Sequence, residues 1–146
     1  MLHVDRYQLI PTSGIGTLGT NFYRTTSIYD NQGRQVATAQ FAQVGKWQID
    51  YQIYDWRDRV IEVKRGIAMN PPTLPDFNDT SWLKTIAKII YYGERIDKSL
   101  SFFDVGTNDY TGTKYHYDNW DRVRSTTSFA VINGTETPLA PYTVQD

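Results

Sequence analysis

Apolar and polar residues alternate along several short segments of the chain, a period of two that is typical of strands with one buried face. The clearest case is 46–54, where Trp47, Ile49, Tyr51 and Ile53 fall on one face. The segments between such runs are rich in Gly, Asn, Asp or Pro, which favour turns and loops. The pattern predicts an all-β fold. The other expected strands are 2–10, 20–29, 34–43, 59–64, 99–103, 114–117 and 122–132.

Three segments depart from this alternation. Residues 69–79 contain three prolines and are expected to form a long connector, because proline has no amide hydrogen to donate to a sheet. In 81–92 the apolar residues fall at helical spacing, which favours a short helix, whereas 89–92 suits a strand equally well. Residues 106–112 begin and end with glycine and are expected to form a loop.

Composition supports β structure and narrows the classes of function. The 146 residues fit a single domain, 1–146, and 14% of them are aromatic, a residue class that sheets favour. The formal net charge is -1, so the chain lacks the basic footprint of a nucleic-acid-binding protein. No segment approaches the roughly 18 consecutive apolar residues of a membrane-spanning helix. Cysteine is absent and histidine occurs twice, so we expect neither a metal site nor a cofactor.

A six-residue motif occurs three times, at 29–34, 54–59 and 117–122: Tyr-Asp, two variable residues, Gly or Asp, and Arg. Tyr is expected to end a strand, and Asp to accept a backbone amide hydrogen from two residues further on. The fifth position requires a left-handed backbone, which glycine adopts freely and aspartate tolerates. Arg then begins the return strand, where it can meet the turn aspartate or lie over the tyrosine ring. The motif therefore predicts a hairpin, carried by Tyr29, Asp30, Gly33, Arg34, Tyr54, Asp55, Arg59, Tyr117, Asp118 and Arg122.

These three units resemble the YD repeats of the RHS/YD-repeat family, whose members are large, mostly extracellular proteins that include bacterial polymorphic toxins, toxin-complex cocoon subunits and teneurins. The resemblance covers roughly 20–132. It implies consecutive antiparallel hairpins in a twisted, curved sheet, with repeat units around 20–45, 46–68 and 84–132. It also favours a strand rather than a helix over 85–92. Degenerate copies of the motif are expected at 91–95 and at Phe103-Asp104.

The resemblance also implies a function. In the family the repeats enclose cargo or present surfaces, and they are not catalytic. We therefore expect a structural module outside the cell or at its surface, which self-assembles by pairing sheet edges with other copies or neighbouring repeats. The tail 142–146 resembles a strand cut as another unit begins, so the chain is expected to be an excerpt of a longer array or a small protein that assembles.

Two tryptophans suggest an alternative function. Trp56 and Trp120 lie inside motif turns, where a place in the core is hard to argue, so they are candidate contacts for a glycan or a surface receptor. The spaced glycines of 14–19 match part of a dinucleotide-binding fingerprint, but a strand-like run follows them instead of a helix, so we expect a flexible loop. The acidic residues of 94–121 are expected to be turn or solvated carboxylates rather than a calcium site or a catalytic pair. We expect no enzymatic activity.

Overall fold

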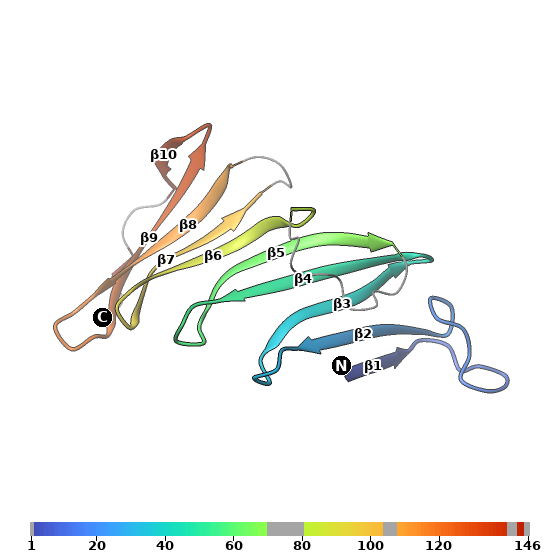
Figure 1. Ribbon diagram of the computed structural model, residues 1–146. Helices are drawn as coiled ribbons and strands as arrows, with labels where there is room; N and C mark the ends of the chain where they lie inside the picture. The colour runs from blue at the N-terminus through green and yellow to red at the C-terminus, as the bar shows by residue number, and fades with distance from the viewer. Residues whose placement is uncertain (1, 70–80, 104–107, 140–142, 145–146) are drawn as a thin grey trace. The chain divides into compact units, whose positions relative to one another are not determined.

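The computed structural model describes residues 2–69, 81–103, 108–139 and 143–144. Within these residues the fold is all-β and contains no helix (Figure 1). The strands are antiparallel, and neighbours in the sheet follow one another in the chain from β1 to β10, while β11 pairs with β9. The strands are β1 (Leu2–Tyr7), β2 (Phe22–Tyr29), β3 (Gln35–Gln43), β4 (Lys46–Tyr54), β5 (Val60–Met69), β6 (Lys84–Tyr92), β7 (Arg95–Phe102), β8 (Tyr110–Tyr117), β9 (Val123–Ile132), β10 (Thr135–Pro138) and β11 (Thr143–Val144).

The prediction of an all-β fold built from consecutive antiparallel hairpins is confirmed. The short helix considered for 81–92 is wrong, because 84–92 forms strand β6, which pairs with β7. β-Branched and aromatic side chains favour a sheet in this segment. Partly covered residues lie on both faces of β6, so its sequence lacks the clean alternation that identifies a half-buried strand.

The loop expected over 106–112 is also partly wrong, since Tyr110, Thr111 and Gly112 belong to β8. Within this strand, position 112 is a glycine because the ring of Phe129, its cross-strand partner, occupies the space that a side chain would fill. Strand β7 begins at Arg95, earlier than the predicted 99–103, and β10 is a strand that the sequence pattern did not indicate. Residues 70–80 of the proline-rich connector lie outside the described residues.

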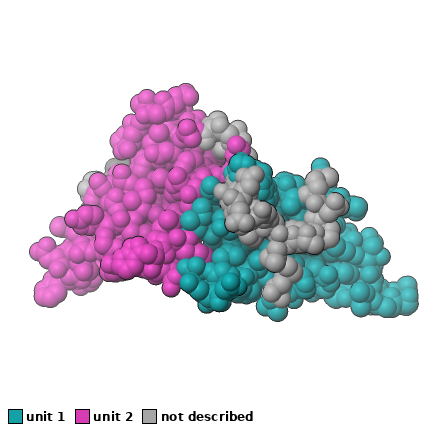
Figure 2. Space-filling model, in the orientation of Figure 1, with its two compact units in different colours: residues 1–53, 64–83 teal, residues 54–63, 84–146 magenta. Residues whose placement is uncertain are grey.

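The chain divides into two compact units, which Figure 2 colours separately: 1–53 with 64–83, and 54–63 with 84–146. Unit 1 contains β1 to β3, nearly all of β4, and the later part of β5. Its core is a cluster of buried side chains on β2, β3 and β4, with Trp82 packed against it. This core consists of Ile28, Ala37, Ala39, Trp47 and Ile49. The alternating face predicted for 46–54 therefore supplies two residues of the buried layer.

Unit 2 contains the first part of β5 and strands β6 to β11. Its core cluster is Leu100, Phe129 and Val131, with Phe102 and Tyr110 packed against it. The rings of Tyr110 and Phe129 meet edge to face, with centroids 6.4 Å apart. In Figure 1 the turns β4–β5, β6–β7 and β8–β9 lie at the same end of this unit, as an antiparallel meander requires. The unit therefore brings three hairpin turns together, and two of them carry the repeated motif.

Candidate functional site

The three motif turns are built by the same hydrogen bonds. In the turn that follows β4, Asp55 Oδ1 accepts the backbone N–H groups of Arg57 and Arg59, at 2.8 and 3.0 Å. The backbone N–H of Asp55 donates to the carbonyl of Arg59 at 2.9 Å and closes the hairpin. Asp30 and Asp118 make the corresponding bonds in their own turns, at 2.8 to 3.0 Å. The predicted bond from aspartate to the amide two residues on is confirmed in all three turns.

The side chain of the motif arginine also bonds to the turn aspartate, through the second carboxylate oxygen. Arginine Nε donates to aspartate Oδ2 in all three turns, at 2.7 Å in Asp30–Arg34, 2.9 Å in Asp55–Arg59 and 2.8 Å in Asp118–Arg122. We call each of these pairs, together with the two amide bonds to the same aspartate, a turn clamp. The predicted contact between the motif arginine and the turn aspartate is confirmed. One carboxylate thus fixes both the turn backbone and the first side chain of the return strand.

The fifth motif position adopts the left-handed backbone that the spacing requires. The φ angle is 81° at Gly33, 61° at Asp58 and 63° at Asp121. The prediction for this position is confirmed. The sheet register shifts beside two of these turns, between Ile28 and Tyr29 and between His116 and Tyr117, so the clamp accompanies a bulge at the end of the strand.

The turn clamp lowers the pKa of its aspartate. At Asp55, burial raises the pKa, but the bonds from the Arg59 side chain and from the amides of Arg59 and Arg57 outweigh it and leave the pKa lowered. The same balance lowers the pKa of Asp30. At Asp118 the amide of Arg122 is the largest influence, and it lowers the pKa against the opposing effect of burial. The three carboxylates are therefore held in the ionised form by hydrogen bonds to the charged state.

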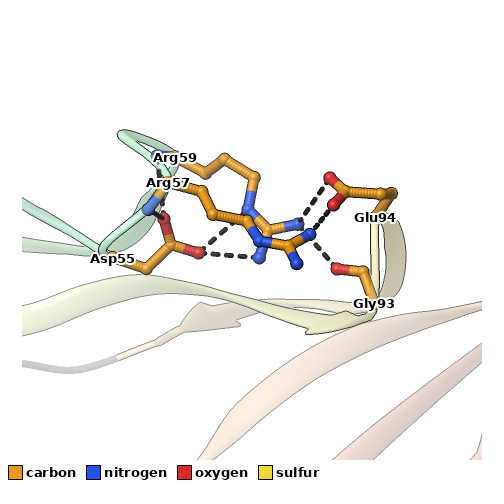
Figure 3. Close-up of polar contacts among 5 residues, drawn as sticks. All are labelled: Asp55, Arg57, Arg59, Gly93 and Glu94. Atoms are coloured by element: carbon orange, nitrogen blue, oxygen red, sulfur yellow. Dashed lines mark hydrogen bonds and ion pairs between the residues drawn. The ribbon is translucent and has the colours of Figure 1, made fainter.

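Neighbouring turns of unit 2 are linked to one another, as Figure 3 shows for two of them. Arg59, besides closing its own clamp, donates through Nη1 to the carbonyl oxygen of Gly93 at 2.7 Å. Its guanidinium lies over the ring of Tyr91, 4.0 Å from the centroid. Arg57 forms an ion pair with Glu94 across the same gap. The turn after β4 is thereby fastened to the turn after β6.

The turn after β6 is fastened in the same way to the turn after β8. Arg95 forms an ion pair with Asp121 and lies over the ring of Tyr117, 5.4 Å from its centroid. The hydroxyl of Tyr117 donates to the carbonyl oxygen of Ile96 at 2.8 Å. Each of these two arginines therefore stacks on a tyrosine of the next hairpin. The motif suggested stacking on the tyrosine of the same hairpin, whereas these arginines stack on tyrosines of the next hairpin.

The residues that link the turns were only partly indicated by the sequence. The degenerate copy expected at 91–95 contributes Tyr91, Gly93, Glu94 and Arg95 to these links, but only Gly93 and Glu94 separate its strands, instead of the five residues of each motif turn. Asp104 of the other degenerate copy lies outside the described residues. The first motif tyrosine, Tyr29, is exposed, whereas Tyr54 and Tyr117 are half-buried.

The structure places both candidate tryptophans at the linked end of unit 2. Trp56 is 83% exposed and Trp120 is 79% exposed, so neither ring contributes to the core. The guanidinium of Arg57 lies over the ring of Trp56, 4.4 Å from its centroid. Tyr92, the last residue of β6, is also exposed at this end. These aromatic rings sit on turns whose backbones are fixed by the clamps and by the links between them.

The structure also describes the glycine-rich segment and the metal-ligating residue types that were considered from the sequence. The glycines of 14–19 precede strand β2, and Gly14, Gly16 and Gly19 all have positive φ, so this segment lacks the helix of a dinucleotide fingerprint. No group of three or more metal-ligating side chains occurs in the part of the chain that the structure describes. The same residues include no helix of the length and apolar character needed to cross a membrane.

Comparison with known proteins found no match: no family model, no curated protein and no solved structure is significantly similar to the chain.

Proposed function

We propose that this chain is a non-catalytic structural module, similar to a segment of a YD-repeat array, which works outside the cell or at its surface. The observation that carries the proposal is the turn clamp, which recurs with nearly the same bond lengths in three hairpins. In the clamp, the charged side chains of the motif bond to groups of the same hairpin. This is expected of a motif whose role is structural. The arginine stacking between hairpins extends the same role, since it joins one repeat to the next.

In this proposal the module grows by pairing at its sheet edges. Strand β1 stands at one end of the strand order, and Leu2 and Val4 on it are exposed. Edge strands with exposed apolar side chains pair readily with another strand, and Asp5 on β1 is paired with Arg24 of β2. At the other end, β10 carries Pro138, which has no amide hydrogen to offer a further strand. The edge of β1 is therefore the expected site of pairing with a neighbouring repeat or another copy.

Light scattering on a sizing column tests the proposed edge pairing. We expect the chain to form species heavier than 16.9 kDa, and Val4→Lys to reduce their mass, because a lysine on an edge strand opposes pairing. Val44→Lys is the matched control, since Val44 is exposed in the β3–β4 turn, away from the edge. A monomer at all concentrations would contradict pairing between copies. If both substitutions lowered the mass of the assembled species equally, the contact between copies would lie outside the edge of β1.

Glycan or receptor binding is the second candidate, and the exposure of Trp56 and Trp120 favours it. Flat aromatic rings on fixed turns offer stacking surfaces for sugar rings. Affinity electrophoresis through gels that contain a soluble polysaccharide tests it. We expect a glycan binder to be retarded, and Trp56→Ala with Trp120→Ala to abolish the retardation without loss of stability. If the polysaccharides retard neither the original chain nor the variant, the structural role alone remains.

A further inference from the structure

One end of unit 1 presents apolar side chains to solvent on two separate loops. Ile10 is 93% exposed and Ile15 is 72% exposed, both in the connection between β1 and β2, where Leu9 is exposed too. Val44, in the turn between β3 and β4, is 88% exposed. We call these four residues the apolar tip. Single exposed apolar residues are ordinary, but a group of them at one end of a unit marks an interaction site.

The two loops that carry the apolar tip lie side by side. The connections β1–β2 and β3–β4 leave the same end of the antiparallel strands, and Figure 1 shows the β1–β2 loop extending beyond the strand ends. Residues 17–20 of the first loop and 42–44 of the second line one shallow cleft of about 330 Å³, together with Tyr23 and Phe41. The two loops therefore adjoin at this cleft, with Val44 among its lining residues and the two isoleucines on the β1–β2 loop.

The loop holds a definite shape, so the exposure of its apolar residues follows from its fold. Asn21 organises it: the side-chain oxygen of Asn21 accepts the amide hydrogen of Thr17 at 2.9 Å. Its side-chain nitrogen donates to the carbonyl of Leu9 at 3.3 Å. The backbone carbonyl of Asn21 accepts the amide hydrogens of Gln8 and Leu9. A side chain at Gly16 would collide with Asn21, which ties the glycine spacing to this arrangement.

Charge is absent from the tip and positive just behind it. Residues 7–23 contain no Asp, Glu, Lys, Arg or His. Arg6, which precedes this stretch, and Lys46, the first residue of β4, are exposed, whereas Arg24 is paired with Asp5 at 2.7 Å. Tyr7 and Tyr23 are partly exposed at the base of the tip. From the tip toward the strands, the apolar residues come first, then the tyrosines, then the cations. This order matches the layers of a lipid surface, which are acyl chains, interface and anionic headgroups.

We propose that the apolar tip inserts shallowly into the interface of a lipid bilayer with anionic headgroups. Ile10 and Ile15 are 93% and 72% exposed, which suits a soft surface into which these side chains can sink. The cleft beside them is shallow and supplies no deep pocket for a protein side chain. Arg6 and Lys46 supply the charge complementarity that commits the proposal to an anionic bilayer. The insertion is peripheral, and the backbone of the loop remains hydrogen-bonded within unit 1.

Sedimentation with vesicles tests this proposal. The full chain is mixed with vesicles of phosphatidylcholine alone, or of phosphatidylcholine and phosphatidylglycerol in equal parts. We expect binding to the anionic vesicles that weakens with added salt, and weaker binding to the neutral vesicles. The variant Ile10→Ser with Ile15→Ser should lower the partition coefficient at least about tenfold, because each isoleucine loses its transfer into the interface.

Two further variants separate insertion from other effects. Val44→Ser, on the second loop, should also weaken binding, and it remains informative if the double variant folds poorly. Ile132→Ser is the matched control, since Ile132 is an exposed isoleucine at the end of β9, outside both the tip and the β1 edge. We expect its binding to equal that of the original chain. Absence of sedimentation with either vesicle, or equal binding by all variants, would overturn the proposal. A change in mass without lipid binding would assign the tip to protein contact and overturn it as well.

Discussion

The guanidinium of Arg59 lies 4.0 Å over the ring centroid of Tyr91, a residue of the next hairpin, while its Nε bonds to Asp55 of its own turn. One side chain thus closes a turn and fastens it to its neighbour. Arg122 closes its own turn with the same geometry. The side chain of Arg59 is 23% exposed, whereas that of Arg122 is 75% exposed. The same motif position therefore has two different structural environments.

This difference predicts unequal effects of the same substitution. Arg59→Ala should lower the free energy of unfolding by about 2 kcal/mol, because it removes the stacking on Tyr91 and the bond to the Gly93 carbonyl in addition to its own clamp. Arg122→Ala should cause a clearly smaller loss, since an exposed ion pair is screened by solvent. Urea denaturation monitored by circular dichroism measures both losses. Equal losses would mean that the contacts between hairpins add little to stability.

The clamped aspartates predict a loss of stability in acid. Their pKa values are lower in the folded chain than the unfolded value of about 4, so their stabilising effect is complete above that pH. It is lost as the pH falls through the lower, folded pKa. Asp55→Asn removes the charge and should lower the urea midpoint at neutral pH. The difference from the original chain should narrow as the pH falls through the lowered folded pKa of Asp55, where the carboxylate of the original chain protonates.

A control separates this effect from general acid denaturation. Glu136→Gln removes one carboxylate on the exposed strand β10, outside the turn clamps, and should leave the pH dependence unchanged. If Asp55→Asn retains the full pH dependence of the original chain, the clamp is not a source of acid sensitivity.

Substitutions of Gly33 test whether the fifth motif position requires a left-handed backbone. Its φ of 81° is left-handed, and a Cβ atom built there would have no neighbour within 4 Å, so a substitution acts on the backbone alone. Gly33→Ala should lower stability by about 1 kcal/mol. Gly33→Asp should cost less, because Asp58 and Asp121 adopt the same conformation in the equivalent positions. Thermal unfolding of the two variants ranks them, and a smaller loss for alanine would contradict the assignment.

Local turn chemistry could be predicted from the sequence because it depends on residues within six positions of one another. Asp55, Asp58 and Arg59 form the turn that their spacing indicates. The stacking of Arg59 on Tyr91 could not be predicted in this way, since the partners are far apart in the chain and the register of the strands brings them together. Strand β6 resembled a helix because partly covered residues on both of its faces obscured the alternation.

The apolar tip was missed for a different reason. Composition and net charge describe the whole chain, and a net charge of -1 conceals the uncharged stretch 7–23 and the exposed cations Arg6 and Lys46. The glycines in this stretch indicated a loop, but nothing in the pattern placed the loop of Ile10 and Ile15 at the same end of the unit as the turn of Val44. That arrangement depends on the pairing of β1 to β4, which brings the two loops to one end of the unit.

Gly112 is expected to be sensitive to substitution, because it lies against the core of unit 2. A Cβ atom at this residue would stand 2.3 Å from the ring of Phe129, which lies across the glycine from the neighbouring strand. Gly112→Ala should therefore force the ring out of its position and destabilise the unit by about 2 kcal/mol. Phe129→Leu alone should also be destabilising, because the ring packs with Tyr110 and Leu100. In the double variant the smaller leucine relieves the collision, so its loss should be less than the sum of the two single losses. A double-mutant cycle by urea denaturation measures this coupling, and simple additivity would show that ring and glycine do not compete for the same space.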